Sequence, residues 1–408
     1  IGRFFCIILN LFQDLIKKTM SKHFETQAIR SQTERSQFSE HSTPLYLTSS
    51  FIFEDAEEMR ASFAEEKERN LYSRFSNPNT AEFVNKIVAL EGAESGYAFA
   101  TGMSAIFSTF AALLNAGDHV VSCRSIFGST HTLFTKYFPK WNIETSYFNV
   151  DELDQIESLI QTNTKILYVE TPTNPGVDIL DLEQLGKLAK KHHLIFIVDN
   201  CFATPYLQNP IEYGADLVIH SATKLIDGQG RVLGGVTVGK RELIKEVYLF
   251  SRNTGPAMSP FNAWVLSKSL ETLAVRVERH CENALKVAKF LEEHQQVNLV
   301  KYPFLKSHRS YEIAKKQMKM GGNIVVFEIK GGIDAGRKFL NNIKMCSLSA
   351  NLGDTRTIVT HPSSTTHGKL SREDLLEVGI TDGLIRVSVG LESSNDIIYD
   401  LKQALENE

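Results

Sequence analysis

A lysine and an aspartate stand just beyond two apolar segments of this 408-residue chain. Asp199 directly follows the run LIFIV, and Lys224 lies in HSATK, four residues beyond the apolar part of DLVIH. Each residue alone has a common explanation, because aspartate often caps a helix and lysine is usually solvated. A carboxylate that ends an apolar strand nevertheless needs a cationic partner, since burying it unpaired is unfavourable. The two residues can therefore supply a nucleophilic amine and a counterion for a positively charged group.

Groups that can bind phosphate lie near this pair in the sequence. Ser221 and Thr223 place hydroxyls beside Lys224, and a glycine-rich segment follows. Gly102 and Met103 come after the apolar run GYAFA and lead into an apolar helical segment. Their backbone N–H groups can bind an anion at a helix N-terminus. Hydroxyls and backbone N–H groups in these positions predict a phosphate site.

Tyr72 and Arg74, in NLYSRFSNPNT, offer a phenol and a guanidinium two residues apart. On an extended segment they face the same side and can hold one phosphate. Together with the lysine, the aspartate and the hydroxyls, they form the set that a pyridoxal-phosphate site needs. The lysine amine links to the cofactor, and the aspartate keeps the ring nitrogen protonated so that the ring withdraws electrons.

Other motif interpretations fit less well. The run GQGRVLGG misses the dinucleotide fingerprint G-x-G-x-x-G and precedes a strand, whereas that fingerprint follows one. Ser221 to Lys224 is formally S-x-x-K, but the S-D-N and K-T-G motifs of serine acylases are missing. His361 and His367 lack a third ligand at a familiar spacing, so hydrogen-bonded loop residues are expected there, and no metal.

The elements that must position these residues are short apolar runs that alternate with amphipathic helices such as residues 182–193. This alternation predicts an α/β fold with a mostly parallel sheet covered on both faces, in which ligands bind at the carboxyl ends of the strands. The expected strands are residues 96–100, 119–123, 165–170, 194–199, 216–220 and 234–239.

A second, smaller α+β domain is expected after about residue 260, because 408 residues exceed what one core of about 250–300 residues accommodates. It begins with one long helical region at 261–294 and includes strands at 324–329 and 384–389. Near the N-terminus, residues 45–53 resemble a strand, and the charge run at 65–69 resembles a solvated helix face.

Composition narrows the class of protein. A net charge of -4 gives no global basic field, so a nucleic-acid partner is not expected. No segment approaches the ~20 apolar residues of a membrane helix. Five scattered cysteines are typical of free thiols in a reducing compartment, which favours the cytoplasm.

Residues 1–19 are apolar and precede Met20, so they are interpreted as an upstream extension outside the native protein, with a cleaved signal as the alternative.

Several ordered motifs resemble the cysteine/methionine-metabolism family of pyridoxal-phosphate enzymes from about residue 25 to the end. They are NLYSRFSNPNT, ATGMSAI, VETPTNP, VDNCFATP, HSATKLIDGQGRVLGG and LIRVSVGLE. The resemblance implies fold type I (aspartate-aminotransferase-like) with a seven-stranded sheet, and a homotetramer of dimers that share active sites. It divides the chain into an arm to the neighbouring subunit at 20–70, a cofactor-binding domain at 71–262 and a small domain at 263–408.

The resemblance also implies a role for each candidate residue. Lys224 carries the cofactor as a Schiff base, and Asp199 pairs with its ring nitrogen. The substrate's α-carboxylate binds Arg386, and Asn351 lies in the substrate site, where many members have serine. The phosphate is held by Ser221, Thr223, Gly102 and Met103, and by Tyr72 and Arg74 of the neighbouring subunit; Asn174 lies near the ring hydroxyl.

Departures from the family pattern narrow the expected activity. The residue that stacks on the cofactor ring is tyrosine in many relatives and Phe127 here, in SIFGST, so an acid/base hydroxyl is lost. SIFGST, DGQGRVLGG and ANLGDTRT together are most similar to sulfhydrylases of O-succinylhomoserine. The implied reaction replaces succinate by sulfide to give homocysteine, in methionine biosynthesis. O-acetylhomoserine sulfhydrylase, cystathionine γ-synthase and γ-lyase activities remain open, and a catalytically silent binding protein is disfavoured because Lys224 and Asp199 are both present.

Overall fold

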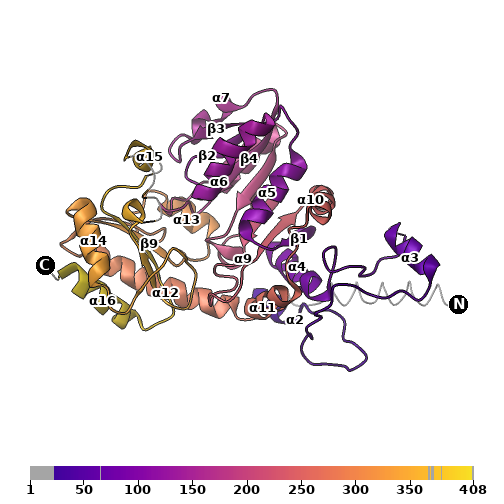
Figure 1. Cartoon of the computed structure of the whole chain (residues 1–408). Coiled ribbons are helices and arrows are strands. Elements are labelled where there is room, and N and C mark those ends of the chain that lie inside the picture. The colour runs from indigo at the N-terminus through magenta and orange to yellow at the C-terminus, as the bar shows by residue number, and fades with distance from the viewer. Residues whose placement is uncertain (1–22, 65, 366–367, 369–371, 378, 407–408) are drawn as a thin grey trace.

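The structure is a computed structural model that describes residues 23–406 except 65, 366–367, 369–371 and 378. The expected upstream extension at 1–19 and His367 lie outside the described residues. Figure 1 shows a large sheet flanked by helices, with a second sheet and its own helices beside it.

The large sheet has seven strands in the order β1-β7-β6-β5-β4-β2-β3. Only β7 runs antiparallel to its neighbours, so the mostly parallel sheet is confirmed. All six expected strands are present, and the seventh, β3, was not expected because its side chains are mostly half-exposed. The strands are β1 Ser95–Phe99, β2 His119–Cys123, β3 Glu144–Phe148, β4 Thr164–Glu170, β5 Ile195–Asp199, β6 Leu217–Ser221 and β7 Gly235–Gly239.

Helices cover this sheet, and several of them begin at a residue whose side chain caps the helix. In α8 (Leu182–Lys191), Asp181 accepts hydrogen bonds from two backbone N–H groups, and Leu182, Leu185 and Ala189 are buried. In α4 (Pro78–Glu91), Asn77 caps the helix and Pro78 stands in its first turn, a favoured position for proline. The other helices of this part are α2 Phe24–Arg30, α3 Ala56–Phe63, α5 Gly102–Leu113, α6 Gly128–Thr132, α7 Ile156–Leu159, α9 Thr204–Leu207 and α10 Arg241–Thr254.

The second sheet has five strands in the order β10-β11-β12-β9-β8 and is antiparallel except between β10 and β11. It confirms the smaller α+β domain expected in the C-terminal part. Its strands are β8 Val297–Lys301, β9 Ile324–Ile329, β10 Ser347–Leu348, β11 Ile358–Thr360 and β12 Leu384–Ser388, and its helices are α14 Gly332–Asn342, α15 Arg372–Glu377 and α16 Ser394–Glu406. Helix α13 (Tyr311–Gln317) lies between β8 and β9 in the sequence but packs Ala314 into the core of the large sheet.

The helical region expected at 261–294 is two helices, α11 (Pro260–Leu270) and α12 (Leu273–Glu292). The first part of α12 packs into the core of the large sheet through Leu273 and Val277, and the last part packs into the small core through Val287 and Leu291. Helix α12 therefore belongs to both cores. The expected boundary at 262/263 falls within α11 and stays a prediction.

Two expectations for the N-terminal arm were wrong. Residues 45–53 form no strand, and only an isolated bridge joins Ser50 to Tyr72. This segment has no partner strand to complete its hydrogen bonds, and the side chain of Ile52 is 91% exposed. The described part of the charge run, residues 66–69, lies beyond the end of α3 at Phe63 and not on a helix face. Its side chains fold back onto that helix through ion pairs such as Lys67 with Glu58 at 2.6 Å.

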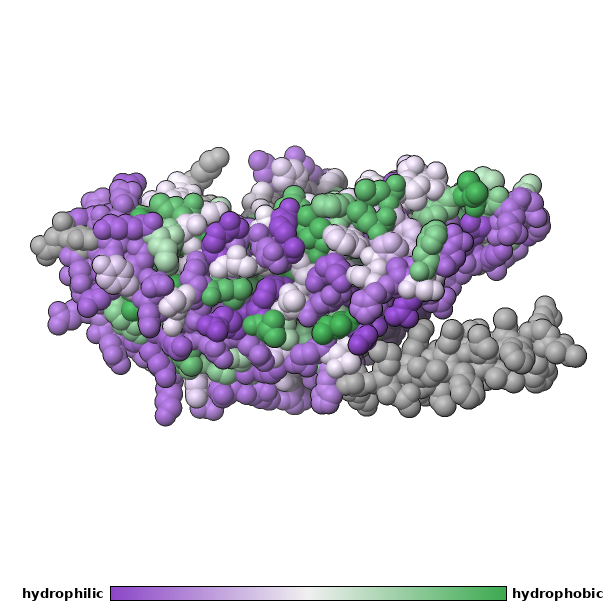
Figure 2. Space-filling model, turned by 90° about the horizontal axis from the view of Figure 1, so that it is seen from below, coloured by the Kyte–Doolittle hydropathy of each residue, from purple (hydrophilic) through white to green (hydrophobic). Residues whose placement is uncertain are grey.

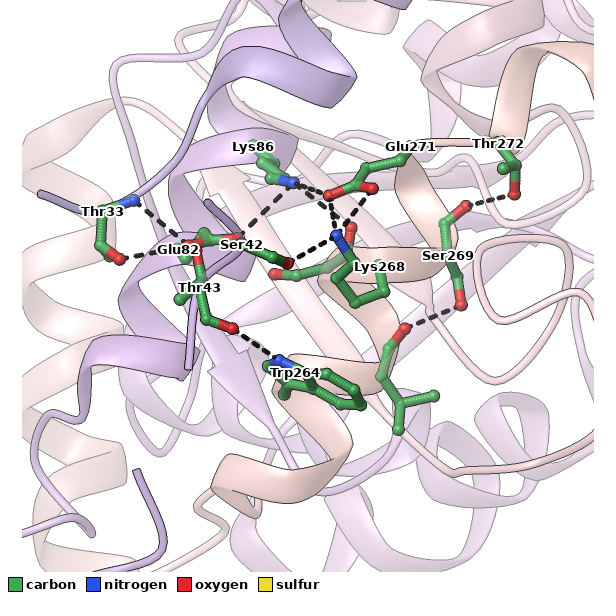
Figure 3. A network of polar contacts seen from close by, with 12 residues as sticks. Thr33, Ser42, Thr43, Glu82, Lys86, Trp264, Lys268, Ser269, Glu271 and Thr272 are labelled. Carbon is green, nitrogen blue, oxygen red and sulfur yellow. Dashed lines mark hydrogen bonds and ion pairs between the residues drawn. The ribbon is translucent and has the colours of Figure 1, made fainter. Parts of the chain in front are cut away.

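A buried polar network fastens the arm to the body (Figure 3). The carboxylate of Glu82 on α4 accepts hydrogen bonds from Thr33 and Thr43 of the arm. Lys86, whose side chain is fully buried, lies 3.6 Å from Glu82 and 3.4 Å from Glu271. Because this ammonium is surrounded by two carboxylates and little water, its ion pairs are far less screened than surface ones. The network thus holds the arm at α4.

We expect Lys86→Ala to lower the stability of the protein by about 3–5 kcal/mol, because it leaves the buried Glu82 carboxylate without its cation. The matched control is Lys268→Ala, since Lys268 also pairs with Glu271, at 2.7 Å, but its side chain is 32% exposed. Exposed pairs contribute about 0–1 kcal/mol. Urea denaturation followed by circular dichroism measures both, and equal losses in the two variants would contradict the prediction.

Candidate active site

A cavity of about 260 Å³ opens at the carboxyl ends of β4, β5 and β6. Parallel strands that end together leave their last side chains at one edge of the sheet, which is where such folds bind ligands. The structure brings nine of the predicted residues to this cavity: Gly102, Met103, Phe127, Asn174, Asp199, Ser221, Thr223, Lys224 and Arg386.

Lys224 lies in the turn after β6, and its amine donates a hydrogen bond of 2.6 Å to Asn351 Oδ1. Burial lowers the pKa of Lys224, and the nearby Arg386 cation lowers it further. A lysine with a lowered pKa is more often found as the free amine, the form that acts as a nucleophile or base.

Asp199 is the last residue of β5 and is only 6% exposed. Its Oδ1 accepts the backbone N–H of Cys201 at 3.0 Å, and Oδ2 lies 3.5 Å from the hydroxyl of Tyr168. Burial raises the pKa of Asp199 to about 6, while these two hydrogen bonds and His220 act in the opposite direction. The buried carboxylate lacks a full cationic partner in the described part of the chain, so it suits a positively charged ligand group.

An anion cradle lies where α5 begins. The side chain of Thr101 caps Ser104 N–H, whereas the N–H groups of Gly102 and Met103 stand in the first turn, where helices lack internal acceptors. A Cβ on Gly102 would stand 2.6 Å from the Cβ of Ser221, so only glycine lets the helix approach the end of β6 this closely. The N–H groups, the Ser221 hydroxyl and the helix dipole form a set of donors suited to a phosphate.

Arg386, on β12 of the second sheet, reaches into the same cavity and is 6% exposed. Its Nη1 donates to Asn174 Oδ1 at 3.2 Å, and it forms no ion pair in the described part of the chain. Burial lowers the pKa of Arg386 to about 10. A structural ion pair was the alternative explanation for this arginine; among the described residues Glu170 interacts with it electrostatically and raises its pKa, but the two form no ion pair. The guanidinium is therefore available for a carboxylate ligand.

The structure does not bring Tyr72 and Arg74 to the cavity within one chain. Arg74 packs against Tyr72 and Phe75 and donates to the carbonyl of Arg252, in a separate depression near β1. The ring of Tyr72 is 41% exposed. If the two side chains act at a cofactor site, that site belongs to another copy of the chain.

Among the cavity-lining residues that sequence reasoning missed, two have titratable side chains, Glu170 and Cys201. Glu170 ends the apolar run KILYVE at the same position in its strand as Asp199 in β5. The rule that drew attention to Asp199, a carboxylate at the end of an apolar strand, would have found Glu170 as well. Cys201 is buried, and its thiol donates to the carbonyl of Ser221 at 3.7 Å.

His361, weighed above as a metal ligand, is hydrogen-bonded within the protein. Its Nδ1 lies 2.7 Å from Ser364 Oγ and its Nε2 lies 2.8 Å from the carbonyl of Asp382. Among the described residues, no group of three or more His, Cys, Asp or Glu side chains is placed to hold a metal. No described helix is long and apolar enough to cross a membrane.

The cavity fits pyridoxal phosphate in the chemistry of its walls. A partly buried lysine, an aspartate at a strand end, an anion cradle and an aromatic ring at Phe127 surround one space. The fold and these groups define a pyridoxal-phosphate-dependent enzyme of fold type I. The chain belongs to the family described as Cys/Met metabolism PLP-dependent enzyme, whose sequence pattern matches residues 25–406.

Individual relatives cover nearly the whole chain. An O-succinylhomoserine sulfhydrylase of Pseudomonas aeruginosa is 45% identical over 94% of this chain and 95% of its own length. An L-methionine gamma-lyase of Fusobacterium nucleatum subsp. polymorphum is 44% identical over 93% of this chain and 97% of its own. The crystal structure of an O-acetylhomoserine (thiol)-lyase candidate from Campylobacter jejuni superposes with a TM-score of 0.90 at 35% identity, covering 94% of this chain and 100% of that one, and contains N'-pyridoxyl-lysine-5'-monophosphate.

Proposed function

We propose that this enzyme converts O-succinylhomoserine and sulfide to homocysteine and succinate in methionine biosynthesis. The observation that carries the substrate assignment is the 45% identity to the Pseudomonas aeruginosa sulfhydrylase over almost the full length of both chains. The free Arg386 guanidinium in the cavity supports an amino-acid substrate, because it matches an α-carboxylate. The buried thiols at Cys123, Cys201, Cys281 and Cys346 are unpaired, which supports placement in the cytoplasm.

Each side chain has a task in this reaction. Bound pyridoxal phosphate draws electrons away from the substrate's α carbon. Lys224 would hold the cofactor. Once released by substrate, its amine would take one proton from the α carbon and one from the β carbon, and would return a proton to each carbon after sulfide has added at the γ carbon. Burial lowers the pKa of its amine, which favours the free-amine form that a general base needs. Asp199 pairs with the protonated ring nitrogen, Phe127 stacks on the ring, and Asn351 and Arg386 position the amino acid.

The test is a turnover panel with succinyl-, acetyl- and phosphohomoserine, each offered with sulfide and with cysteine. We expect kcat/KM to be highest for the succinyl ester with sulfide. A higher value for the acetyl ester, or for cysteine as nucleophile, would reassign the reaction within the family.

A second candidate is L-methionine γ-lyase activity, because a relative with that name is 44% identical to this chain. The two activities differ in the fate of the substrate. In the sulfhydrylase reaction a nucleophile enters at the γ carbon, whereas in the lyase reaction the product is released as an α-keto acid. Incubation with methionine alone, followed by an assay for α-keto acid and methanethiol, distinguishes the two activities. Phe127 has no ring hydroxyl to protonate a leaving group. This favours an ester substrate over methionine, since a carboxylate leaves without protonation more readily than methanethiolate does.

Arg386→Lys is expected to weaken the binding of all homoserine esters together, by about 1.5–3 kcal/mol, since lysine keeps the charge but loses the two-pronged geometry. The preference among esters should stay unchanged, because the α-carboxylate is common to all of them. Measurement of KM and kcat for each ester checks this. A change in the succinyl-to-acetyl preference would show that Arg386 contacts the leaving group instead.

We also propose that the active site is shared between two copies in a homotetramer built from dimers. Helix α3 projects from the body (Figure 1), and hydrophobic side chains are visible towards the same projecting end in Figure 2. Leu47 and Ile52, on this arm, are 67% and 91% exposed, which suits burial against a second copy. Tyr72 and Arg74 follow directly and would reach the phosphate of that copy.

Mixing Lys224→Ala chains with Arg74→Ala chains should restore activity if the site is shared. Each hybrid dimer contains one site with both defects and one site with neither. At a 1:1 ratio and full exchange, about a quarter of the wild-type activity is expected, because half of the dimers are hybrids with one intact site. Each variant mixed with itself is the control. Absence of recovery at any ratio would place Arg74 outside the site.

A further inference from the structure

Glu170 and Asp199 are the last residues of two neighbouring parallel strands, β4 and β5, and they stand opposite each other in the register. Neighbouring strands lie about 4.8 Å apart, so the two carboxyl groups share one edge of the sheet. Glu170 is 2% exposed and Asp199 is 6% exposed, and both line the cavity that contains Lys224. The site therefore has two buried carboxyls where the cofactor's ring nitrogen requires one.

The two carboxyls have different partners. Glu170 Oε2 accepts the backbone N–H of Phe127 at 2.7 Å. Asp199 has two donors, the N–H of Cys201 and the hydroxyl of Tyr168. Neither carboxyl forms an ion pair in the described part of the chain. Hydrogen bonds to a carboxylate favour its charged form, so Asp199 is the better place for the negative charge.

The groups that face Glu170 do not supply a full countercharge. Across the sheet it faces Cys123 on β2 and Asp199 on β5, with Tyr168 on β4 itself. The Arg386 cation lowers the pKa of Glu170. Burial and the negative charge of Asp199 have the larger effect and raise that pKa well above its usual value. Two like charges side by side in a buried site do not both ionise, so one proton stays on the pair.

We propose that Glu170 is a positioning residue that acts in its protonated, neutral form. It holds Phe127 at the start of α6 through the backbone N–H and leaves Asp199 as the one negative charge at the cofactor's ring nitrogen. Phe127 is 43% exposed and lines the cavity, so the bond from Glu170 sets where its ring lies over the cofactor. The inference rests on the proposed pairing of Asp199 with the ring nitrogen, which the Asp199 variants in the Discussion test separately.

The experiment compares Glu170→Gln with Glu170→Ala by fluorescence titration of the apo-enzyme with pyridoxal phosphate, from pH 5 to pH 9. Glutamine copies the size of a neutral carboxyl and keeps an acceptor for Phe127 N–H. We expect its cofactor Kd at neutral pH to stay within about threefold of wild type, whereas Glu170→Ala weakens binding by about 3- to 10-fold. Equal Kd values for the two variants would overturn the positioning of Phe127.

The pH at which cofactor binding is half lost decides the charge of Glu170. The phosphate of the cofactor titrates near pH 6, so the informative quantity is the difference in midpoint between variant and wild type. If Glu170 is neutral, Glu170→Gln leaves the midpoint unchanged. If Glu170 is ionised, removing its charge lowers the pKa of Asp199 and shifts the midpoint down by about one unit or more, which would overturn the proposal.

A control variant separates this effect from a loss of stability. Asp400→Asn also removes a buried carboxylate, but Asp400 lies on α16, outside both the arm and the cavity. It should leave the Kd and the midpoint at their wild-type values. If Glu170→Ala does not fold, the midpoint of Glu170→Gln still decides between the neutral and the ionised form.

Discussion

Replacing Lys224 with alanine is expected to abolish turnover of every homoserine ester. In the proposed reaction, the variant lacks both the amine that would hold the cofactor and the base that would move protons at the α and β carbons. A general base alone contributes about 10²- to 10⁴-fold to a rate, so a residual rate below about 1% of wild type is the least that we expect. The amine is the atom that Asn351 contacts at 2.6 Å, so the substitution also frees that amide.

The covalent link between the cofactor and Lys224 can be measured as well as the rate. Borohydride reduction of the cofactor-loaded wild type, followed by peptide mass spectrometry, should place a pyridoxyl group on Lys224 and on no peptide of the variant. Lys319→Ala is the matched control, because Lys319 lies outside the cavity, at Tyr206 and Glu278. A reduced adduct on another lysine of the wild type would move the cofactor link away from Lys224.

Asp199→Ala has the second largest expected effect. Removing one partner of a buried charge pair weakens binding by about 2–5 kcal/mol, so the affinity for pyridoxal phosphate should fall roughly 30- to 4,000-fold. Asp199→Asn keeps an acceptor for Cys201 N–H but loses the charge, so its affinity for pyridoxal phosphate should fall by a factor in the same range. Equilibrium titration of the apo-enzyme measures both variants, and a wild-type Kd for either would exclude Asp199 as the partner of the ring nitrogen.

The same residue links pH to the stability of the apo-enzyme. The pKa of Asp199 rises from 3.8 to about 6 on folding, so the folded state loses stability as pH rises between these values. Above pH 6 the loss is complete and amounts to about 3 kcal/mol, because one pKa unit corresponds to about 1.4 kcal/mol. The neutral Asp199→Asn apo-enzyme should therefore melt at a higher temperature than wild type at pH 7, and at the same temperature below pH 4. A lower melting temperature at pH 7 would contradict this.

Local patterns were sufficient for the elements that surround the site. The runs before Asp199 and Lys224 are apolar throughout because β5 and β6 are buried on both faces, and this property is visible in a single stretch of sequence. The glycine at 102 was recognisable because a strand and an apolar helix meet there. Strand β3 escaped notice since it lies at the edge of the sheet with mixed side chains.

The same local reasoning failed where an element needs a distant partner. Residues 45–53 have the composition of a strand, but a strand forms only beside another, and only the single bridge at Ser50 and Tyr72 is available. The helical region 261–294 is broken at Glu271, where the side chain turns to the buried Lys86 of α4. Neither outcome is encoded in the segment itself.

The sequence by itself determined the type of enzyme, since Lys224, Asp199 and the predicted phosphate-binding groups stand at strand ends and helix starts that their own neighbours define. The tertiary structure alone decided which groups meet. Asn351 reaches Lys224 across 127 positions, and Arg386 reaches Asn174 across 212. The pairing of Glu170 with Asp199 depends on the register of β4 and β5. These contacts arise because the packing of helices on the two sheets sets the order of the strands and brings the two sheets together. No local pattern of apolar residues specifies that packing.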